Sequence, residues 1–306
     1  MTDLLNPVFT DADKAREALE AVRWPNGPVC PHCGCSEKIG KVQGKSHRPG
    51  LYYCGDCTGH FTVTVGTVFE RSKIPLNKWW LACHLLGSSK KGMSAHQLHR
   101  MLGVTYKTAW FMAHRIREAM TPAKGSVGPI GGEGKTVEVD ETYLTRSKKT
   151  RKPKGHIPHQ RHAIQVVSLL ERGGEVRSTI DHRTVRAAIA EHLEVGSRLV
   201  TDKAQAYIRL MPKADHASVD HSKGEYVRDD VHTNTLEGYF SILKRGLIGT
   251  YQHVDKKHLG RYLAEFDFRM NNRAALGVND ADRSKVLMKG IEGKRLTYRR
   301  TNRPEA

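Results

Sequence analysis

The chain has 306 residues, and 50 Lys and Arg against 32 Asp and Glu give it a formal net charge of +18. This excess indicates a polyanionic partner, because Lys and Arg side chains release counterions when they meet phosphates. Its 38% apolar and 27% charged residues are typical of a globular chain and argue against disorder. A membrane span would need about 18 consecutive apolar residues, and the sequence offers no such run.

The first predicted element is a helix over residues 10–23, within an N-terminal segment that we place at 1–28. Thr10 or Asp11 can serve as its N-cap. Apolar residues at helical spacing predict one buried face. The Trp-Pro-Asn-Gly-Pro sequence at 24–28 then ends the helix.

The second predicted unit is a zinc ribbon over residues 29–70. Cys30-x-x-Cys33 and Cys54-x-x-Cys57 are separated by 20 residues, and each pair can present two thiolates to one ion. Four thiolates leave no open position for a substrate, so the zinc would be structural. Cys35 is an alternative to Cys33, although the Cys-x-x-Cys spacing fits a zinc knuckle better. Clustered cysteines of this kind also indicate a reducing cytoplasm.

Residues 71–125 are predicted to be helical and to bind DNA. A helix over 76–87 precedes two helices within 94–120, joined at Gly103 as in a helix-turn-helix. An ordinary helical hairpin is the alternative. The residues of the second helix that could contact DNA are Tyr106, Lys107, Thr108 and Arg115.

The glycine-rich stretch at 125–134 predicts the main domain boundary, after which strands and helices alternate. This order predicts an α+β domain over residues 126–284, with a mixed sheet flanked by helices. The strands are expected at 136–144, 162–171, 175–180 and 197–201, and the helices at 185–193, 236–247 and 257–271. Residues 285–306 are expected to form a basic tail.

Three acidic residues stand out by their positions in this domain. Asp140 lies in a strand, Asp202 follows another strand, and Glu237 lies near the start of a helix. Carboxylates from two strands and a helix can converge at one edge of a sheet and hold two divalent cations, such as Mg²⁺. Lys244, two helical turns beyond Glu237, could hold a phosphate nearby.

The spacing of the acids leaves alternatives open. Each acid taken alone is also explained by structure, since strand ends and helix starts are often acidic. Glu138 points to the same strand face as Asp140 and competes for the first role. The candidates that compete with Glu237 for the third role are Asp229, Asp230 and Asn234.

The combination of these motifs resembles the DDE transposases of bacterial insertion sequences, and most closely the subgroup with an N-terminal zinc ribbon and an ISXO-type catalytic domain. The similarity covers about residues 20–275. The segments that carry it are CPHCG (30–34), YYCGDC (52–57), FTVTVGTVFERSKIPLNKWW (61–80), VEVDETYL (137–144), VTDKAQAY (200–207) and HTNTLEGYFSILKRGLIGTYQHV (232–254).

The resemblance implies a ribonuclease-H-like catalytic domain that cuts and joins DNA with two Mg²⁺ or Mn²⁺ ions. It implies Asp140, Asp202 and Glu237 as metal ligands and Lys244 as the accompanying base. Asn234 is sometimes discussed beside the glutamate in this subgroup. Cys35 is an extra thiol, and the long basic segment at 147–159 is either a strand-binding element or a solvated loop.

One expected partner is double-stranded DNA, which includes the terminal inverted repeats and the target. The other is at least one further copy of the chain, because two element ends must be held together. The expected location is the bacterial cytoplasm, in association with the nucleoid. Two alternative functions remain: a zinc-ribbon transcription regulator with a helix-turn-helix, and a ribonuclease-H-like nuclease that cleaves without joining.

Overall fold

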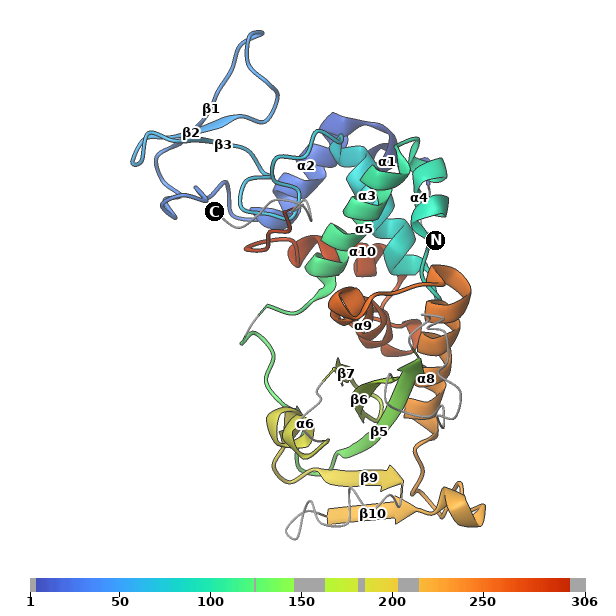
Figure 1. Ribbon diagram of the computed structural model, residues 1–306. Coiled ribbons are helices and arrows are strands. Elements are labelled where there is room, and N and C mark those ends of the chain that lie inside the picture. Colours follow the sequence, from blue (N-terminus) through green and yellow to red (C-terminus); the bar gives the residue numbers. More distant parts are fainter. Residues whose placement is uncertain (1–3, 124, 146–162, 181–184, 203–214, 298–306) are drawn as a thin grey trace, which may run out of the picture. The chain divides into compact units, whose positions relative to one another are not determined.

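The computed structural model describes residues 4–123, 125–145, 163–180, 185–202 and 215–297 (Figure 1). The chain forms two compact units. Unit 1 combines residues 1–122 with 278–306, and unit 2 comprises residues 123–277.

Unit 1 begins with two short helices whose ends are set by local capping residues. α1 spans Pro7–Thr10 and α2 spans Ala12–Arg23. The carboxylate of Asp11 accepts hydrogen bonds from the backbone N–H groups of Asp13 and Lys14, so Asp11 is the N-cap of α2. A small antiparallel sheet follows, in the order β1-β2-β3, formed by Ile39–Lys41, Tyr52–Cys54 and His60–Phe61.

Three more helices of unit 1 follow the sheet, at positions close to those expected. They are α3 (Leu76–Ser88), α4 (Ala95–Leu102) and α5 (Tyr106–Met120). The apolar face expected for α5 is buried, at Ala109, Met112, Ala113, Ile116 and Met120.

The C-terminal part of the chain differs from the basic tail expected at 285–306. A helix, α10, spans Asp280–Lys289, and the residues from 278 onward belong to unit 1. Leu287, Met288 and Ile291 are buried there, and Val68 N–H donates to the carbonyl of Ile291. The apolar side chains in the segment therefore outweigh its positive charge and hold it on the helices of this unit.

Unit 2 is built around a mixed five-stranded sheet in the order β10-β9-β5-β6-β7. β10, β9 and β5 run parallel to one another, whereas β6 is antiparallel to both of its neighbours, β5 and β7. The strands are β5 (Thr136–Thr145), β6 (Ala163–Glu171), β7 (Val176–Thr179), β9 (Arg198–Asp202) and β10 (Asp215–Val219). A separate parallel pair joins β4 (Ile130–Gly131) to β8 (Leu193–Glu194).

Helices cover both faces of this sheet (Figure 1). α6 (Val185–His192) packs on one face, against Val137, Val139 and neighbouring apolar residues. α8 (Asn234–Arg245), a π-helical turn over Gly246–Tyr251 and α9 (Lys256–Asn271) pack on the other. Short 3-10 turns span His221–Lys223 and Ala274–Leu276. The α+β architecture with a cysteine-bearing sheet, helices and a flanked mixed sheet is thereby confirmed.

Candidate functional site

The four cysteines of the two Cys-x-x-Cys pairs come together in unit 1. Their sulfur atoms all lie within 4.8 Å of one another, and the Sγ–Sγ distances are 3.6 Å for Cys30–Cys57 and for Cys33–Cys54. Four sulfurs at about 2.3 Å from one Zn²⁺ would lie about 3.8 Å apart. The donor set and its spacing therefore fit a structural zinc ion.

Backbone groups of the first knuckle favour the thiolate form of Cys30. Burial of this thiol raises its pKa, but hydrogen bonds from the N–H groups of Cys33 and His32, together with those from the thiols of Cys33 and Cys57, lower the pKa to about 7. Beside the cluster, Trp24 packs edge-on against Tyr52 and Phe61, which stack on each other. This aromatic group is the hydrophobic face on which a ribbon of this size depends.

The two helices expected to bind DNA are joined by a short turn. Ser94 caps α4 by accepting from Gln97 N–H, and Gly103 ends α4 in the left-handed region at φ +59°. Thr105 caps α5 by accepting from Thr108 N–H at 3.2 Å. These local bonds determine where α4 begins and ends and where α5 begins.

The residues expected to contact DNA differ in accessibility. Tyr106 and Lys107 are exposed, and the Tyr106 ring stacks on His96 with centroids 4.3 Å apart. Thr108 is half-buried.

Arg115 departs from the expectation that it contacts DNA, because its side chain is buried. Its guanidinium donates to the carbonyls of Glu70 and Leu296 and lies over the Phe111 ring. The C-terminal segment covers this part of α5, so Arg115 connects segments of unit 1 and does not face solvent.

The three acidic residues come from three elements of unit 2. β5 and β9 run side by side and parallel, with Val139 opposite Thr201, so Asp140 and Asp202 are the next residues on adjacent strands. Glu237 lies in the first turn of α8, which packs against β5. Its carboxylate accepts from Thr233 Oγ1 at 3.2 Å and lies 3.7 Å from His221 Nε2.

The pKa of Asp140 responds to the other two acids of this group. Burial, together with the negative charges of Asp202, Glu141 and Glu237, raises its pKa to about 7. Among the described His, Cys, Asp and Glu residues, the four cysteines are the only group of three or more whose ligand atoms all lie within 4.8 Å of one another. Asp202 and Glu237 thus both lie within electrostatic range of Asp140, and the three carboxylates are not all within 4.8 Å of one another.

The residues that compete with Asp140 and Glu237 for a role as metal ligand have other partners or lie elsewhere. Glu138 is fully buried and forms an ion pair with Arg172, and Asp230 forms one with Arg198. Asp229 is exposed in a turn at φ +53°, and Asn234 is exposed at the start of α8.

Sequence reasoning did not single out His221, which reaches Glu237 from the turn after β10. No spacing signal links these two residues, because they are brought together only by the packing of unit 2. Lys244 is exposed on α8, two turns beyond Glu237. The basic segment at 147–159 lies outside the described residues.

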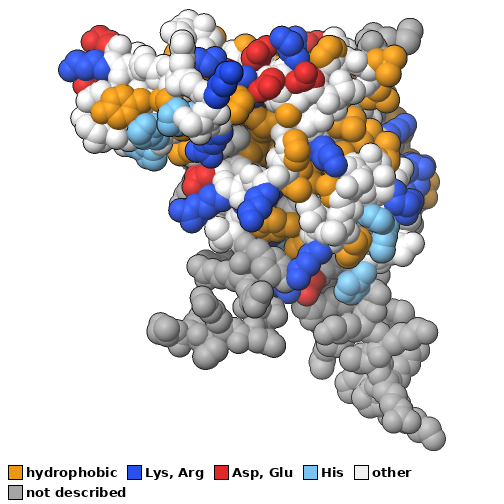
Figure 2. Space-filling view, turned by 90° about the horizontal axis from the view of Figure 1, so that it is seen from above, with side chains coloured by type: hydrophobic (Ala, Val, Ile, Leu, Met, Phe, Trp, Pro, Cys, Tyr) orange, Lys and Arg blue, Asp and Glu red, His pale blue; other side chains and the backbone are white. Residues whose placement is uncertain are grey.

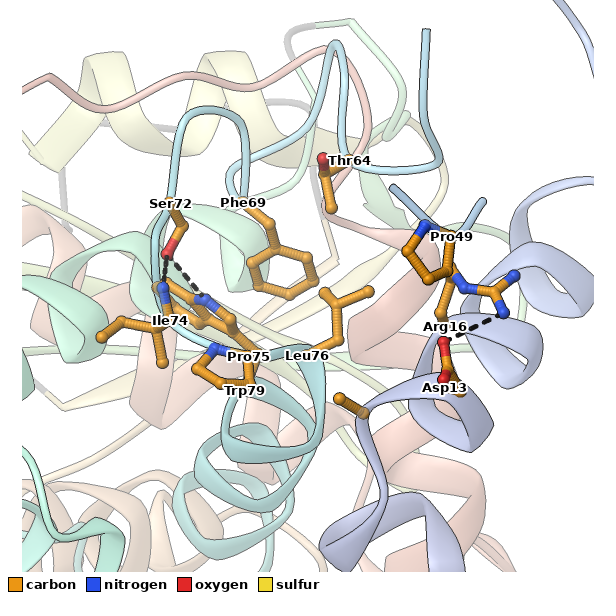
Figure 3. Close-up of a pocket in the computed structure, with 11 residues that line it drawn as sticks. Asp13, Arg16, Pro49, Thr64, Phe69, Ser72, Ile74, Pro75, Leu76 and Trp79 are labelled. Atoms are coloured by element: carbon orange, nitrogen blue, oxygen red, sulfur yellow. Dashed lines mark hydrogen bonds and ion pairs between the residues drawn. The ribbon is translucent and has the colours of Figure 1, made fainter. Parts of the chain in front are cut away.

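A pocket of about 390 Å³ lies in unit 1 (Figure 3). Asp13 and Arg16 of α2 form an ion pair on one side, and Ser72 accepts from Ile74 N–H and Trp79 Nε1 on the other. Its lining contains none of the acidic residues considered above, which belong to unit 2. The pocket therefore does not mark their location.

The face drawn in Figure 2 carries its basic side chains at separate points. Figure 2 shows blue Lys and Arg side chains at many separate points of one face, among hydrophobic ones, with fewer red acidic side chains. No helix in the described part of the chain is long and apolar enough to cross a membrane.

Comparisons with known proteins agree with these features. Residues 131–271 match the ISXO2-like transposase domain family, and residues 10–60 match the transposase zinc-ribbon domain family. An uncharacterized protein in transposable element ISH50 of Halobacterium salinarum is 30% identical over 282 residues. The alignment covers 85% of this chain and 91% of that protein.

Proposed function

Because the chain belongs to the ISXO2-like DDE transposase family with an N-terminal zinc ribbon, we propose that it cuts and joins the ends of its own insertion element. The DDE domain implies transposase activity, and the proposal assigns that activity to particular residues. The observation that carries it is the grouping of Asp140, Asp202 and Glu237 from β5, β9 and α8.

The donor set of this group suits divalent cations. Three carboxylates of like charge, two of them half-buried, would be stabilised by Mg²⁺ or Mn²⁺, which take oxygen ligands. Two such ions, when bound, would activate water or a 3′-hydroxyl and stabilise the leaving oxygen of an in-line phosphoryl transfer. Asp140 would contact both ions, and Asp202 and Glu237 would each complete one coordination shell.

A ribonuclease-H-like fold of unit 2 is part of the proposal. The mixed sheet, with three parallel strands followed by an antiparallel pair and helices on both faces, supports it. The acids sit where parallel strands β5 and β9 lie side by side, and α8 brings the third carboxylate to them from the covering layer.

DNA binding is assigned to the zinc ribbon and to the α4–α5 pair acting as a helix-turn-helix. Tyr106, Lys107 and Thr108 at the start of α5 would contact DNA, and Lys244 would contact a phosphate near the acidic residues. Arg115 is left out because it is buried. A dimer or a larger assembly would hold the two element ends together.

Binding of the full chain to terminal inverted-repeat DNA is expected to weaken by roughly three decades between 50 and 200 mM salt, if about six phosphates are neutralised. Lys107→Ala should lower the slope of log affinity against log salt by about one phosphate contact. Fluorescence anisotropy with labelled DNA measures both quantities. Lys14→Ala is the matched control, since Lys14 is an exposed lysine of α2 paired with Glu17.

A slope that Lys107→Ala leaves unchanged would contradict the placement of the DNA interface at α5. The same conclusion would follow if Lys14→Ala lowered the slope by an equal amount, because the effect would then report only net charge.

The activity itself is tested by incubating the full chain with a pre-cleaved inverted-repeat end that carries a 3′-hydroxyl, in the presence of Mg²⁺ and target DNA. A transposase joins the end to the target, whereas a nuclease only cuts and a regulator leaves the DNA intact. Joined product visible on a sequencing gel is the expected result. Cleavage without joining, or binding alone, would favour one of the other two functions.

A further inference from the structure

Glu138 is a buried carboxylate that the proposed chemistry leaves without a role. Its side chain is 0% exposed and lies on the same face of β5 as Asp140, two residues away. Burying a charge is costly unless it is paired and hydrogen-bonded. The partners of Glu138 therefore indicate what it does.

The first partner of Glu138 is the N-terminal turn of α8. Leu236 N–H donates to Glu138 Oε2 at 2.9 Å, and Thr235 Oγ1 donates to Glu138 Oε1 at 3.0 Å. The hydroxyl of Thr233, the N-cap residue, donates instead to Glu237. A carboxylate from β5 thus satisfies a backbone N–H that a helix leaves open at its start, and its charge favours the positive end of the helix dipole.

The second partner is Arg172, the residue directly after β6. Its Nε donates to Glu138 Oε1 at 2.8 Å, and its two terminal nitrogens donate to the carbonyls of Asp230 and His232, each at 2.7 Å. The guanidinium balances the buried charge and also holds the segment that leads into α8. Three elements, β5, β6 and the start of α8, are thereby joined at one point.

We propose that Glu138, held by Arg172, is a positioning residue that sets the place of the Glu237 carboxylate relative to Asp140. Glu237 directly follows Leu236, the residue whose N–H Glu138 binds, and Asp140 lies on the same strand as Glu138. The strand that carries one proposed metal ligand therefore fixes the helix turn that carries another. This inference rests on the proposed role of the acidic group.

Glu138→Gln is the variant that tests this role, because the amide keeps the size of the side chain and removes its charge. Mn²⁺ binding to the full chain, measured by electron paramagnetic resonance without DNA, is expected to weaken by roughly 10- to 100-fold, as for other residues that orient metal ligands. Strand cleavage should fall in parallel, whereas affinity for inverted-repeat DNA should stay unchanged.

A coupling experiment separates positioning from loss of stability. Glu237→Gln should itself weaken Mn²⁺ binding, and adding Glu138→Gln to it should cause no further loss, because the ligand that Glu138 positions is already absent. Glu265→Gln is the matched control. Glu265 is also 0% exposed and paired with an arginine, Arg269, but it lies on α9 away from the start of α8. Its variant should leave Mn²⁺ affinity unchanged even if thermal unfolding shifts.

The inference is overturned if Glu138→Gln weakens Mn²⁺ binding equally with and without Glu237, or if Glu265→Gln has the same effect. If Glu237→Gln leaves Mn²⁺ affinity unchanged, the proposed metal role of Glu237 fails, and this inference fails with it. Should Glu138→Gln not fold, Thr235→Val removes one hydrogen bond to Glu138. A smaller loss of Mn²⁺ affinity then supports the inference, and unchanged affinity overturns it.

Discussion

Asp140→Asn is expected to reduce strand cleavage and joining by several orders of magnitude while binding of the element ends stays intact. The amide keeps the size of the carboxylate but removes the charge that would contact both cations, so stabilisation of the in-line transition state is lost. Asp202→Asn and Glu237→Gln should also abolish both reactions. Rates of cleavage and strand transfer on inverted-repeat substrates, together with DNA affinity from anisotropy, measure the two effects separately.

Three further variants serve as comparisons for this result. Lys244→Ala should lower the rates less, because a phosphate contact positions DNA without holding metal. Asp229→Asn and Asn234→Ala should retain nearly full activity. If either of them abolished cleavage while Glu237→Gln remained active, the third ligand would be wrongly assigned. Normal cleavage by Asp140→Asn would remove the chemical basis of the proposal.

Cys54→Ser is expected to release the zinc ion and to unfold residues 29–70. The sulfur atoms of Cys54 and its three partners are grouped around one point, and zinc sites of this kind contribute about 10 kcal/mol or more to local folding. So small a ribbon has too little apolar core to compensate. Metal analysis should find about one zinc per chain before the substitution and none after it, and limited proteolysis should then cut within the ribbon.

Cys35→Ser is the control for the zinc prediction, because Cys35 lies outside the cluster and hydrogen-bonds to Asp56. Its zinc content and resistance to proteolysis should match those of the unchanged chain. Full retention of zinc by Cys54→Ser, or loss of zinc in Cys35→Ser, would contradict the assignment of the four ligands.

Local signals in the sequence predicted most helices and the grouping of the four cysteines. Asp11, Ser94 and Thr105 each accept from a backbone N–H two or three residues ahead, so these helix starts depend only on neighbouring residues. The same holds for each Cys-x-x-Cys turn, whose two sulfurs are brought together within four residues. β10 was not expected, since its short sequence Asp215–Val219 becomes a strand by pairing with β9.

The tertiary structure alone separated residues that look alike in the sequence. Alternation along β5 places Glu138 and Asp140 on one face, so the sequence pattern cannot distinguish them. Of these two carboxylates, Glu138 is the one that accepts hydrogen bonds from Arg172 and from the start of α8, which is almost a hundred residues away. Helical spacing could not show that Arg115 would be buried, because the carbonyl that it binds at Leu296 comes from the far end of the chain. Caps and metal knuckles are determined within a few residues, whereas the role of a charged side chain depends on partners that only folding brings near.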